Sequence, residues 1–444
     1  MAANPGLAMT YLSESTTNVE EKSNFFRQSK NFADPGPPPD GGWIAWRQVV
    51  GGFLVVFTCW GFINSFGLFQ TYYASQPDID ASASDISWIG TLQIFLLMFI
   101  GAYSGSASDS GYFRLTSLLG IFLYVLGIFL TSICRQYYQL VLAHGVCVGI
   151  GNGLIFIPTM SVVATYFSPQ RRSLALGLIL CGSAVGGIIL PVFFDHMLLK
   201  VGFGWTMRAF GFIALGLFGI SQILLSKRLP PKDSVRILDF EALKDKVFIL
   251  FMTAMFLNFL GVYFGFFYVG AYARNILGLT FSRSTDLLLA INGAGIPGRL
   301  GPMWLADQRQ WKGVRPVTIM IPVNLMVSVM TFVWIAVKTE RSAYVWAVFY
   351  GFMGNALQSF FPATLADMNV DPRKTGAQIG WGFTIGSFSC LIGVPIAGLL
   401  VQADGGTYRH AQIYAGTCSM CGFIIVCFVA RMILQQQRQV EHPG

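Results

Sequence analysis

Charged residues are scarce in this chain of 444 residues, at 11% of the sequence against 54% for hydrophobic residues. Soluble domains carry about a quarter charged residues, so the composition excludes an ordinary soluble protein. Histidine is also scarce, with 4 residues, and no Gly-x-x-x-x-Gly-Lys sequence occurs, so we expect no direct use of ATP through a phosphate-binding loop. An enzyme needs a nucleophile with a base, or a metal cluster, and the apolar segments support neither.

An apolar core near the start, which a secretory signal peptide requires, is also missing. The first 42 residues are polar and end in "DPGPPPDGG", so we expect a disordered tail that the mature chain retains. The 8 cysteines fall in or at the ends of apolar runs and predict no disulfide framework. Cys418 and Cys421 form a CxxC pair without a second Cys or His pair. We therefore expect neither a metal nor a cofactor.

Long apolar runs recur along the whole chain, and each has about the 20 residues that a helix needs to cross a bilayer. We count twelve, near residues 49–72, 86–107, 115–133, 138–167, 174–194, 208–226, 247–271, 286–306, 316–337, 343–366, 376–401 and 409–431. The sequence thus predicts an all-α integral membrane protein with 12 transmembrane helices, surrounded by lipid.

The net charge of +8 could indicate a nucleic-acid partner, but its distribution points to the membrane. Most Lys and Arg residues lie in the segments that share one side of the predicted membrane, which is the positive-inside pattern. This bias predicts that both termini are cytoplasmic and excludes nucleic acid as the reason for the charge. A basic central loop, 227–246, is expected to carry a short surface helix around 239–246.

The second half of the chain repeats features of the first about two hundred residues later. Pro158, Arg171, Arg172 and Pro191 are echoed by Pro362, Arg373, Lys374 and Pro395, and Asp109 is echoed by Asp307. An even number of spans between equivalent points gives two halves of the same orientation, as in the parallel repeats of some transporters. We therefore expect a tail (1–42), a six-helix bundle (43–226), the central loop (227–246), a second six-helix bundle (247–433) and a tail (434–444).

A glycine-rich turn between the second and third runs, "GSASDSGYFR", has the residue types of an inner gate. Glycine permits a tight turn, and a carboxylate and a guanidinium can latch neighbouring helix ends. A solvated turn is the alternative. The predicted gate residues are Gly105, Asp109, Gly111, Arg114, Arg171, Arg172 and Asp307.

Several motifs resemble those of the monocarboxylate transporter family, within the major facilitator superfamily. "PDGGWIAW" (39–46) resembles the entry signature of that family, and "YFSPQRRSLALGLILCGSAVGG" (166–187) resembles its signature across the fourth and fifth helices. "SFGLFQTYY" and "GRLGPMWLAD" are similar to the fungal branch. The resemblance covers about residues 40–431 and implies the 6+6 major facilitator fold, but it does not fix a substrate, because the fungal branch includes importers and efflux proteins.

Arg299 is the one basic residue expected deep in an apolar run. It precedes Asp307, at the expected inner end of its helix, by eight residues, which places it about 12 Å deep at 1.5 Å per residue. A charge at such a depth normally faces a cavity or a partner, and no other span has a carboxylate at depth. Its planar fork suits a carboxylate, so Arg299 is our first candidate for substrate binding.

A structural role for Arg299 is the alternative, because Gly295 and Pro297 could free backbone carbonyls that accept from the guanidinium. The resemblance favours substrate binding, since the animal members have a substrate-binding arginine at this place. Those members also have a lysine where this chain has Leu68 and an aspartate where it has Gly295. These two departures put lactate-type transport and the usual proton coupling in doubt.

The other substrate candidates are amides and aromatics in apolar runs, which must find polar partners or line a path. They are Asn64, Asn152, Asn258, Asn292 and Tyr263, the last within the aromatic cluster "YFGFFYVG". Bonds to neighbouring helices, or packing for the aromatics, are the alternatives. His144 could relay protons or bond a helix carbonyl.

Together these features predict a secondary transporter, not an enzyme, that moves a small organic acid or secondary metabolite across a fungal plasma membrane by alternating access. An efflux pump for a larger apolar metabolite is one alternative, and a membrane sensor that does not transport is another. The sequence leaves the direction of transport, the oligomeric state and the coupling ion, which could be a proton, undecided.

Overall fold

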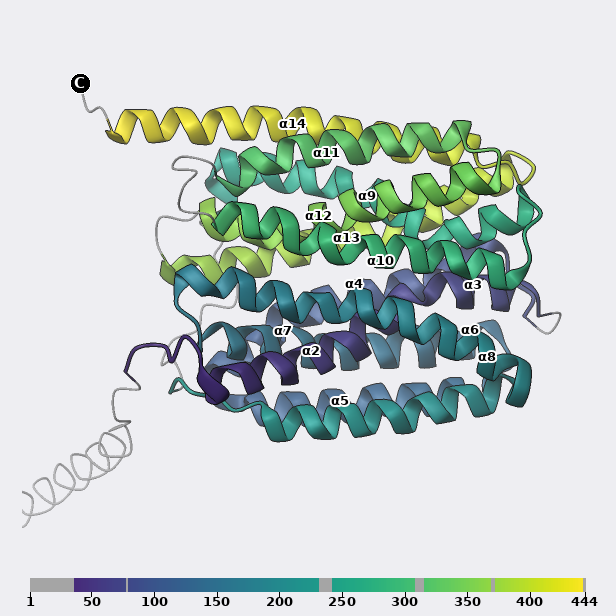
Figure 1. Ribbon diagram of the computed structural model, residues 1–444, viewed down its shortest axis with the longest axis horizontal. Coiled ribbons are helices and arrows are strands. Elements are labelled where there is room, and N and C mark those ends of the chain that lie inside the picture. The colour runs from purple at the N-terminus through teal and green to yellow at the C-terminus, as the bar shows by residue number, and fades with distance from the viewer. Residues whose placement is uncertain (1–35, 77–78, 231–241, 308–314, 369–371, 442–444) are drawn as a thin grey trace, which may run out of the picture.

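The computed structural model describes residues 36–76, 79–230, 242–307, 315–368 and 372–441, and every regular element in these ranges is a helix. The helices run side by side along the long axis of the molecule (Figure 1). They are α2 (Gly42–Asn64), α3 (Phe66–Ala74), α4 (Ala83–Ala107), η1 (Ser108–Tyr112), α5 (Phe113–Thr131), α6 (Tyr137–Leu140), η2 (Val141–Cys147), α7 (Val148–Ala164), α8 (Pro169–Leu224), η3 (Ala242–Lys244), α9 (Lys246–Asn275), α10 (Phe281–Asp307), α11 (Pro316–Val333), η4 (Trp334–Ala336), α12 (Glu340–Met368), α13 (Pro372–Ala403) and α14 (Arg409–Glu441).

Every predicted apolar run coincides with helical structure, but the boundaries between helices differ from the prediction. Within the described ranges, nine helices are long and apolar enough to cross a membrane. One of them, Leu174–Leu224, has 51 residues and would span about 76 Å as one rod, far more than the ~30 Å of a hydrocarbon core. Gly202, at φ 75° and ψ 172°, breaks it, and α8 folds back on itself (Figure 1). The twelve crossings stay a prediction.

The helices from the two halves of the chain form two neighbouring groups (Figure 1). Helices α2 to α8 make up the first half and α9 to α14 the second. We call the end of the bundle at which α2 starts and α14 finishes the terminus side, and the opposite end, where α3 finishes and α14 starts, the distal side. The two halves meet where α4 packs against α13, α8 against α10 and α3 against α9.

Glycines explain how α2 and α8 come close together in the first half. An added Cβ at Gly182 would lie 2.6 Å from the carbonyl oxygen of Phe53, and one at Gly186 would lie 2.5 Å from that of Phe57. Real Cβ atoms do not approach so closely, so only glycine permits this backbone contact. Both glycines belong to the sequence "CGSAVGG", whose role here is helix packing.

The central loop and the tails are only partly described. Of the helix predicted around 239–246, residues 239–241 lie outside the described residues. In the described part, Ala242–Lys244 forms a 3-10 helix, and α9 begins at Lys246. The tail predicted for residues 1–42 is described only from residue 36, and α2 begins at Gly42. The bundle boundaries stay predictions.

Candidate functional site

Arg299 lies inside the protein and is held by an amide from a neighbouring helix. It is 5% exposed, and its Nε and Nη2 donate to Oδ1 of Asn355 on α12 at 3.1 and 2.6 Å. The amide of Asn355 is itself oriented, because its Nδ2 donates to the carbonyl of Gly351 at 2.8 Å. In the part of the chain that the structure describes, no carboxylate pairs with Arg299, so its positive charge is hydrogen-bonded but not neutralised.

The amide of Asn355 also explains why a glycine is needed at position 295. An added Cβ at Gly295 would lie 2.6 Å from Nδ2 of Asn355, so the amide occupies the space that a side chain at 295 would need. Here α10 is continuous from Phe281 to Asp307, and the guanidinium is held by this amide, not by the freed backbone carbonyls that the structural alternative invoked. That detail of the alternative is wrong, whereas the choice between substrate binding and structure stays open.

Side chains from both halves surround Arg299. Cys181 of α8 and Tyr263 of α9 lie near the guanidinium, and Tyr263 forms a side-chain hydrogen bond with Cys390 of α13. All four side chains are at least nine-tenths buried. The guanidinium therefore sits where the first half meets the second, as a site that both halves share would require. We call Arg299, Asn355, Tyr263, Cys181 and Cys390 the arginine cluster.

Asn292 bridges the two halves two turns before Arg299 on α10. Its Nδ2 donates to the carbonyl of Gly187 on α8 at 3.1 Å and to that of Leu288 at 3.0 Å. An added Cβ at Gly187 would lie 2.6 Å from the Asn292 amide, so this contact depends on glycine. The bond favours a role in holding the halves together.

The remaining predicted amides divide by their partners. Asn64 is half-buried and donates to the carbonyl of Ser183 at 3.1 Å, within the first half. Asn258 donates to Ala254 at 2.9 Å and packs against Gly422, away from the arginine cluster. Asn152 is fully buried, and neither its Oδ1 nor its Nδ2 has a hydrogen-bond partner among the described residues. Asn152 is therefore the predicted amide with most bonding capacity left.

His144 is fully buried in an aromatic cage and bonds a phenol. Its Nδ1 lies 3.0 Å from the hydroxyl of Tyr73, and the rings of Phe62, Phe66 and Phe69 lie 4.9 to 5.6 Å from its own. The alternative to a proton relay named a helix carbonyl as its partner, which is wrong, because the hydroxyl of Tyr73 takes that place.

Several contacts between the two halves lie at the middle and the distal side. Ser84 of α4 donates to the carbonyl of Pro395 on α13 at 3.0 Å, and the rings of Phe66 and Phe267 lie 5.2 Å apart. Nearer the middle, Phe388 contacts Phe95 and Phe99 of α4 at 5.2 and 6.1 Å. We call Phe66, Phe267, Ser84 and Pro395 the distal gate.

The predicted gate residues on the terminus side mostly bind within the first half. Arg114 donates from Nη2 to the carbonyl of Leu225 at 2.7 Å and also bonds the carbonyl of Gln222, so it caps the end of α8. Gly111 has φ 107°, a conformation that favours glycine. An added Cβ at Gly105 would lie 2.9 Å from Ile157. The side chains of Asp109 and Asp307 lie outside the described residues.

The "PDGGW" sequence binds the start of α8. Oδ1 of Asp40 accepts from the backbone N–H of Ser168, and Arg171 donates to the backbone carbonyl of Asp40 at 2.6 Å. The Ser168 amide, with smaller help from Arg171 and Arg172, lowers the pKa of the Asp40 carboxyl. Arg172 bonds the carbonyl of Phe167 at 3.4 Å. The two motifs that carry the resemblance therefore contact each other.

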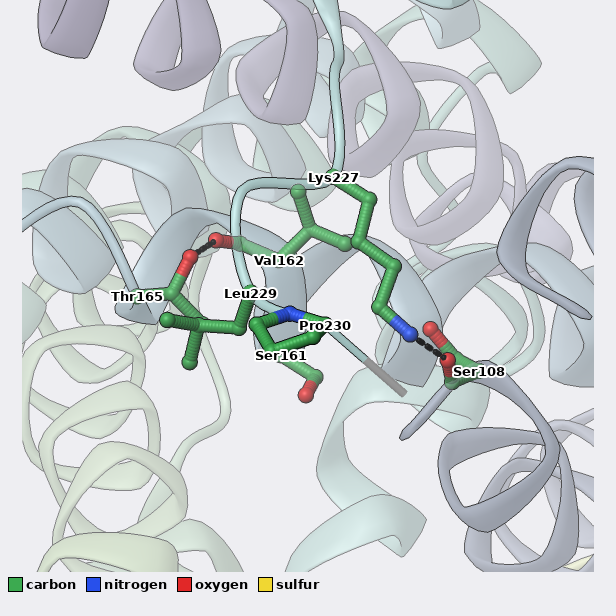
Figure 2. A pocket seen from close by; sticks show the side chains of 7 residues that line it. All are labelled: Ser108, Ser161, Val162, Thr165, Lys227, Leu229 and Pro230. Atoms are coloured by element: carbon green, nitrogen blue, oxygen red, sulfur yellow. Dashed lines mark hydrogen bonds between the residues drawn. The ribbon is translucent and has the colours of Figure 1, made fainter. Parts of the chain in front are cut away.

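The segment after α8 crosses the same side of the first half. Figure 2 shows Lys227 donating to the carbonyl of Ser108 at 2.7 Å, with Leu229 and Pro230 beside Ser161. The cavity among them holds about 70 Å³, well below the ~300 Å³ of small ligand pockets. It is therefore a small gap between packed segments and is too small for an organic solute.

Sequence reasoning missed Asn355 and also an ion pair on the terminus side of the second half. Arg315 donates to Oδ2 of Asp367 at 2.7 Å and to its backbone carbonyl at 2.5 Å. For Asn355 a signal was present, because Gly-Asn occurs at 151–152 and again at 354–355, at corresponding places in the two repeats.

Comparisons with known proteins agree on the fold and the class. Residues 49–394 match the family model described as Major Facilitator Superfamily. An MFS-type transporter of Gibberella zeae is 43% identical, over 88% of this chain and 87% of its own. The aspyridones efflux protein of Emericella nidulans is 34% identical, over 89% and 80%. The crystal structure of the Escherichia coli fucose:proton symporter has a TM-score of 0.61 at 14% identity and covers 87% of this chain and 98% of that one.

Proposed function

The chain belongs to the major facilitator superfamily, and from this premise we propose that it exports a small organic acid, in the manner of the monocarboxylate transporter-like branch, across a fungal plasma membrane. It is a multi-pass membrane transporter, and its relatives are fungal transporters that include one named for efflux of aspyridones. The observation that carries the proposal is Arg299, a buried cation held by a neutral amide at the meeting of the two halves.

The chemistry of the arginine cluster supports an acid as the substrate. A guanidinium has five N–H donors, and Asn355 takes two of them. A carboxylate that binds the remaining donors would neutralise a charge that is otherwise costly inside a membrane. Occupancy by an acid would then ease the movement of the halves past each other, which couples binding to transport.

The distal gate supports a particular state of the transport cycle. The proposed orientation puts the terminus side in the cytoplasm, with two six-helix halves, 43–226 and 247–433, joined by 227–246. The contacts of the distal gate, and that of Phe388 with Phe95, join the halves at the distal side and the middle. This arrangement corresponds to a path closed toward the outside, and export requires the distal gate to open after the solute binds Arg299.

A second candidate is export of a larger apolar metabolite, which a row of aromatic rings favours. From Tyr263 the row continues through Phe259, at 5.9 Å, to Phe361, at 5.2 Å, and Phe383, at 5.6 Å, between ring centroids. These rings join α9, α12 and α13 in the second half. An apolar body lying along them would still place a polar end near Arg299.

The test compares acids with their neutral esters. Inside-out plasma-membrane vesicles from yeast that express the full chain would be given aromatic and aliphatic carboxylic acids, each paired with its methyl ester, at several imposed proton gradients. Arg299→Gln should lower uptake of the acids about tenfold or more, which corresponds to the 1.5–3 kcal/mol of a charged hydrogen bond, and should leave ester uptake unchanged. The gradients report whether protons drive transport.

Arg283→Gln is the matched control, because Arg283 pairs with Glu340 at 2.5 Å on the distal surface of the same helix. It should change neither acid nor ester uptake. Equal loss of acids and esters in Arg299→Gln, with normal amounts of protein in the membrane, would instead make Arg299 a structural or gating residue and favour the apolar metabolite.

A further inference from the structure

A cavity of about 510 Å³ opens on the distal side, above the distal gate. Its volume falls within the ~300–1,000 Å³ that pockets for small ligands occupy. The first half contributes residues of α3 and of the segment between α3 and α4, and the second half contributes residues of α9, of α13 and of the segment between α13 and α14. The lining residues are Gln70, Thr71, Ala74, Ser75, Ser82, Tyr268, Ala271, Arg274, Asn275, Val401, Gln402, Gly406 and Tyr408. We call this cavity the distal vestibule.

The vestibule has a buried floor and an exposed rim. Thr71 and Tyr268 are buried and come from opposite halves, whereas Ser75, Asn275 and Gln402 are exposed. An added Cβ on Gly398 of α13 would overlap the hydroxyl of Tyr268 and would lie 3.0 Å from Cα of Ser84. The floor is therefore part of the contact between the halves, and it must separate when the distal gate opens.

Polar residues make up most of this lining, although the chain as a whole is apolar. Asn275 donates to the hydroxyl of Tyr408 at 3.3 Å. Seven of the other lining residues also carry a hydroxyl, amide or guanidinium group. Ligand pockets combine a mostly apolar surface with a few polar groups that orient the ligand, and the vestibule has both.

Arg274 is the one charged residue among those that line the vestibule. It is half-buried, and its Cζ lies 5.7 Å from the ring centroid of Phe281. A ring face stabilises the cation without using its N–H donors. Of the nearby acids, Asp404 is engaged by Thr407 and by Nδ1 of His410 at 3.0 Å, and Asp85 accepts from Ser82. Among the described residues no carboxylate pairs with Arg274.

We propose that the distal vestibule is a second anion-binding site, at which Arg274 binds the acid group of an organic solute on the outer side of the distal gate. This deepens the proposed function and rests on it for the class of solute. Arg274 follows Tyr263 by 11 positions on the same helix, about 16 Å along its axis. An exported acid that leaves Arg299 thus meets a second guanidinium before it reaches solution.

Protection of a cysteine introduced at the rim tests the site without needing the natural substrate. Gln402→Cys would be made in the full chain with Cys134→Ser, since Cys134 lies near the distal end of α5 and is accessible. We call the sulfur group introduced by Gln402→Cys the rim thiol. Yeast cells expressing this protein would be treated with a neutral polyethylene glycol maleimide, which stays outside the cell. Benzoate and octanoate are the probes, and benzamide and octanamide are their neutral counterparts.

We expect the two acids to slow labelling of the rim thiol at least threefold and the two amides to leave it unchanged. Arg274→Gln should raise the concentration of acid needed for half-protection about tenfold or more, the effect of one lost charged hydrogen bond. Arg274→Lys should retain part of the protection, which distinguishes loss of charge from misfolding. Arg283→Gln, on the same surface, should retain all of it.

Two results would overturn the proposal. One is that neither acid protects the rim thiol in the protein with Arg274 intact. The other is that the acids protect the rim thiol as strongly in Arg274→Gln as before. Arg299→Gln in the protein that carries the rim thiol separates this proposal from the proposed function, because protection from outside should survive it. Arg299→Gln could also change the export of acids and of esters equally while protection of the rim thiol stays intact. That result would contradict the proposed role of Arg299 and would support the anion site in the distal vestibule.

Discussion

Replacing Asn355 with alanine should destabilise the protein far more than replacing other buried amides of the bundle. Asn355 accepts two hydrogen bonds from the Arg299 guanidinium, at 3.1 and 2.6 Å. A hydrogen bond to a charged group contributes about 1.5–3 kcal/mol, and removing one partner of a buried ion costs about 3–5 kcal/mol. We therefore expect Asn355→Ala to lower the free energy of unfolding by about 3 kcal/mol.

Asn292→Ala is the matched control, because Asn292 is also a buried amide that bonds a neighbouring helix, at 3.1 Å from the carbonyl of Gly187. Its partner is neutral, and neutral hydrogen bonds between membrane helices average about 0.6 kcal/mol. The difference between the two substitutions, about 2.4 kcal/mol from these two figures, isolates the charge of Arg299 from the general cost of losing an amide.

The assay is reversible unfolding of the purified full chain in mixed micelles at increasing fractions of a denaturing detergent, followed by tryptophan fluorescence. Arg299→Gln completes a double-mutant cycle. In that background the cost of Asn355→Ala should fall to that of a neutral contact. A cost equal to that of Asn292→Ala, or one that Arg299→Gln leaves unchanged, would refute the reasoning that Asn355 stabilises a buried charge.

Two further substitutions test the distal gate and the contact between the "PDGGW" sequence and the start of α8. An added Cβ at Gly90 would lie 2.5 Å from the ring of Phe66, so Gly90→Ala should favour the state open on the distal side. A cysteine introduced by Thr71→Cys at the buried floor of the vestibule should then be labelled severalfold faster, and unchanged labelling would contradict this. Asp40→Ala should speed hydrogen exchange at the Ser168 amide, which Asp40 caps. This bond lowers the pKa of the Asp40 carboxyl. The stabilisation that it gives is therefore complete above the usual aspartate pKa and is lost as the pH falls through the lowered pKa. Equal exchange at the Ser168 amide in the two proteins at neutral pH would contradict this prediction.

The sequence allowed the helices to be predicted well, because hydrophobic runs of membrane length have few other structures open to them. It did not predict where helices break. Ser65 separates α2 from α3 within one apolar run, and hydropathy does not change there. Gly202 lay between two predicted runs, yet helical hydrogen bonding continues up to it on both sides. Such breaks depend on packing against neighbours, which composition along one segment does not report.

The site was predicted less completely, for a definite physical reason. Buried cations in membrane proteins usually pair with carboxylates or backbone carbonyls, so the sequence pointed to those groups as partners of Arg299. In the structure the partner is the side-chain amide of Asn355. This amide fits beside α10 because position 295 is a glycine. Two residues on different helices that fit only as a pair cannot be recognised from either alone.

The Gly-Asn pair has different surroundings in the two repeats, and only the second repeat places a charged side chain beside it. In the second half Asn355 holds Arg299. In the first half Asn152 is buried without a hydrogen-bond partner among the described residues, and the place corresponding to Arg299 is Gly101, which packs against Ile157. Because the charge lies in the second half and close apolar packing in the first, the acid in the proposed function would bind to the second half. We infer that the first half then acts chiefly as the wall that moves past the bound solute.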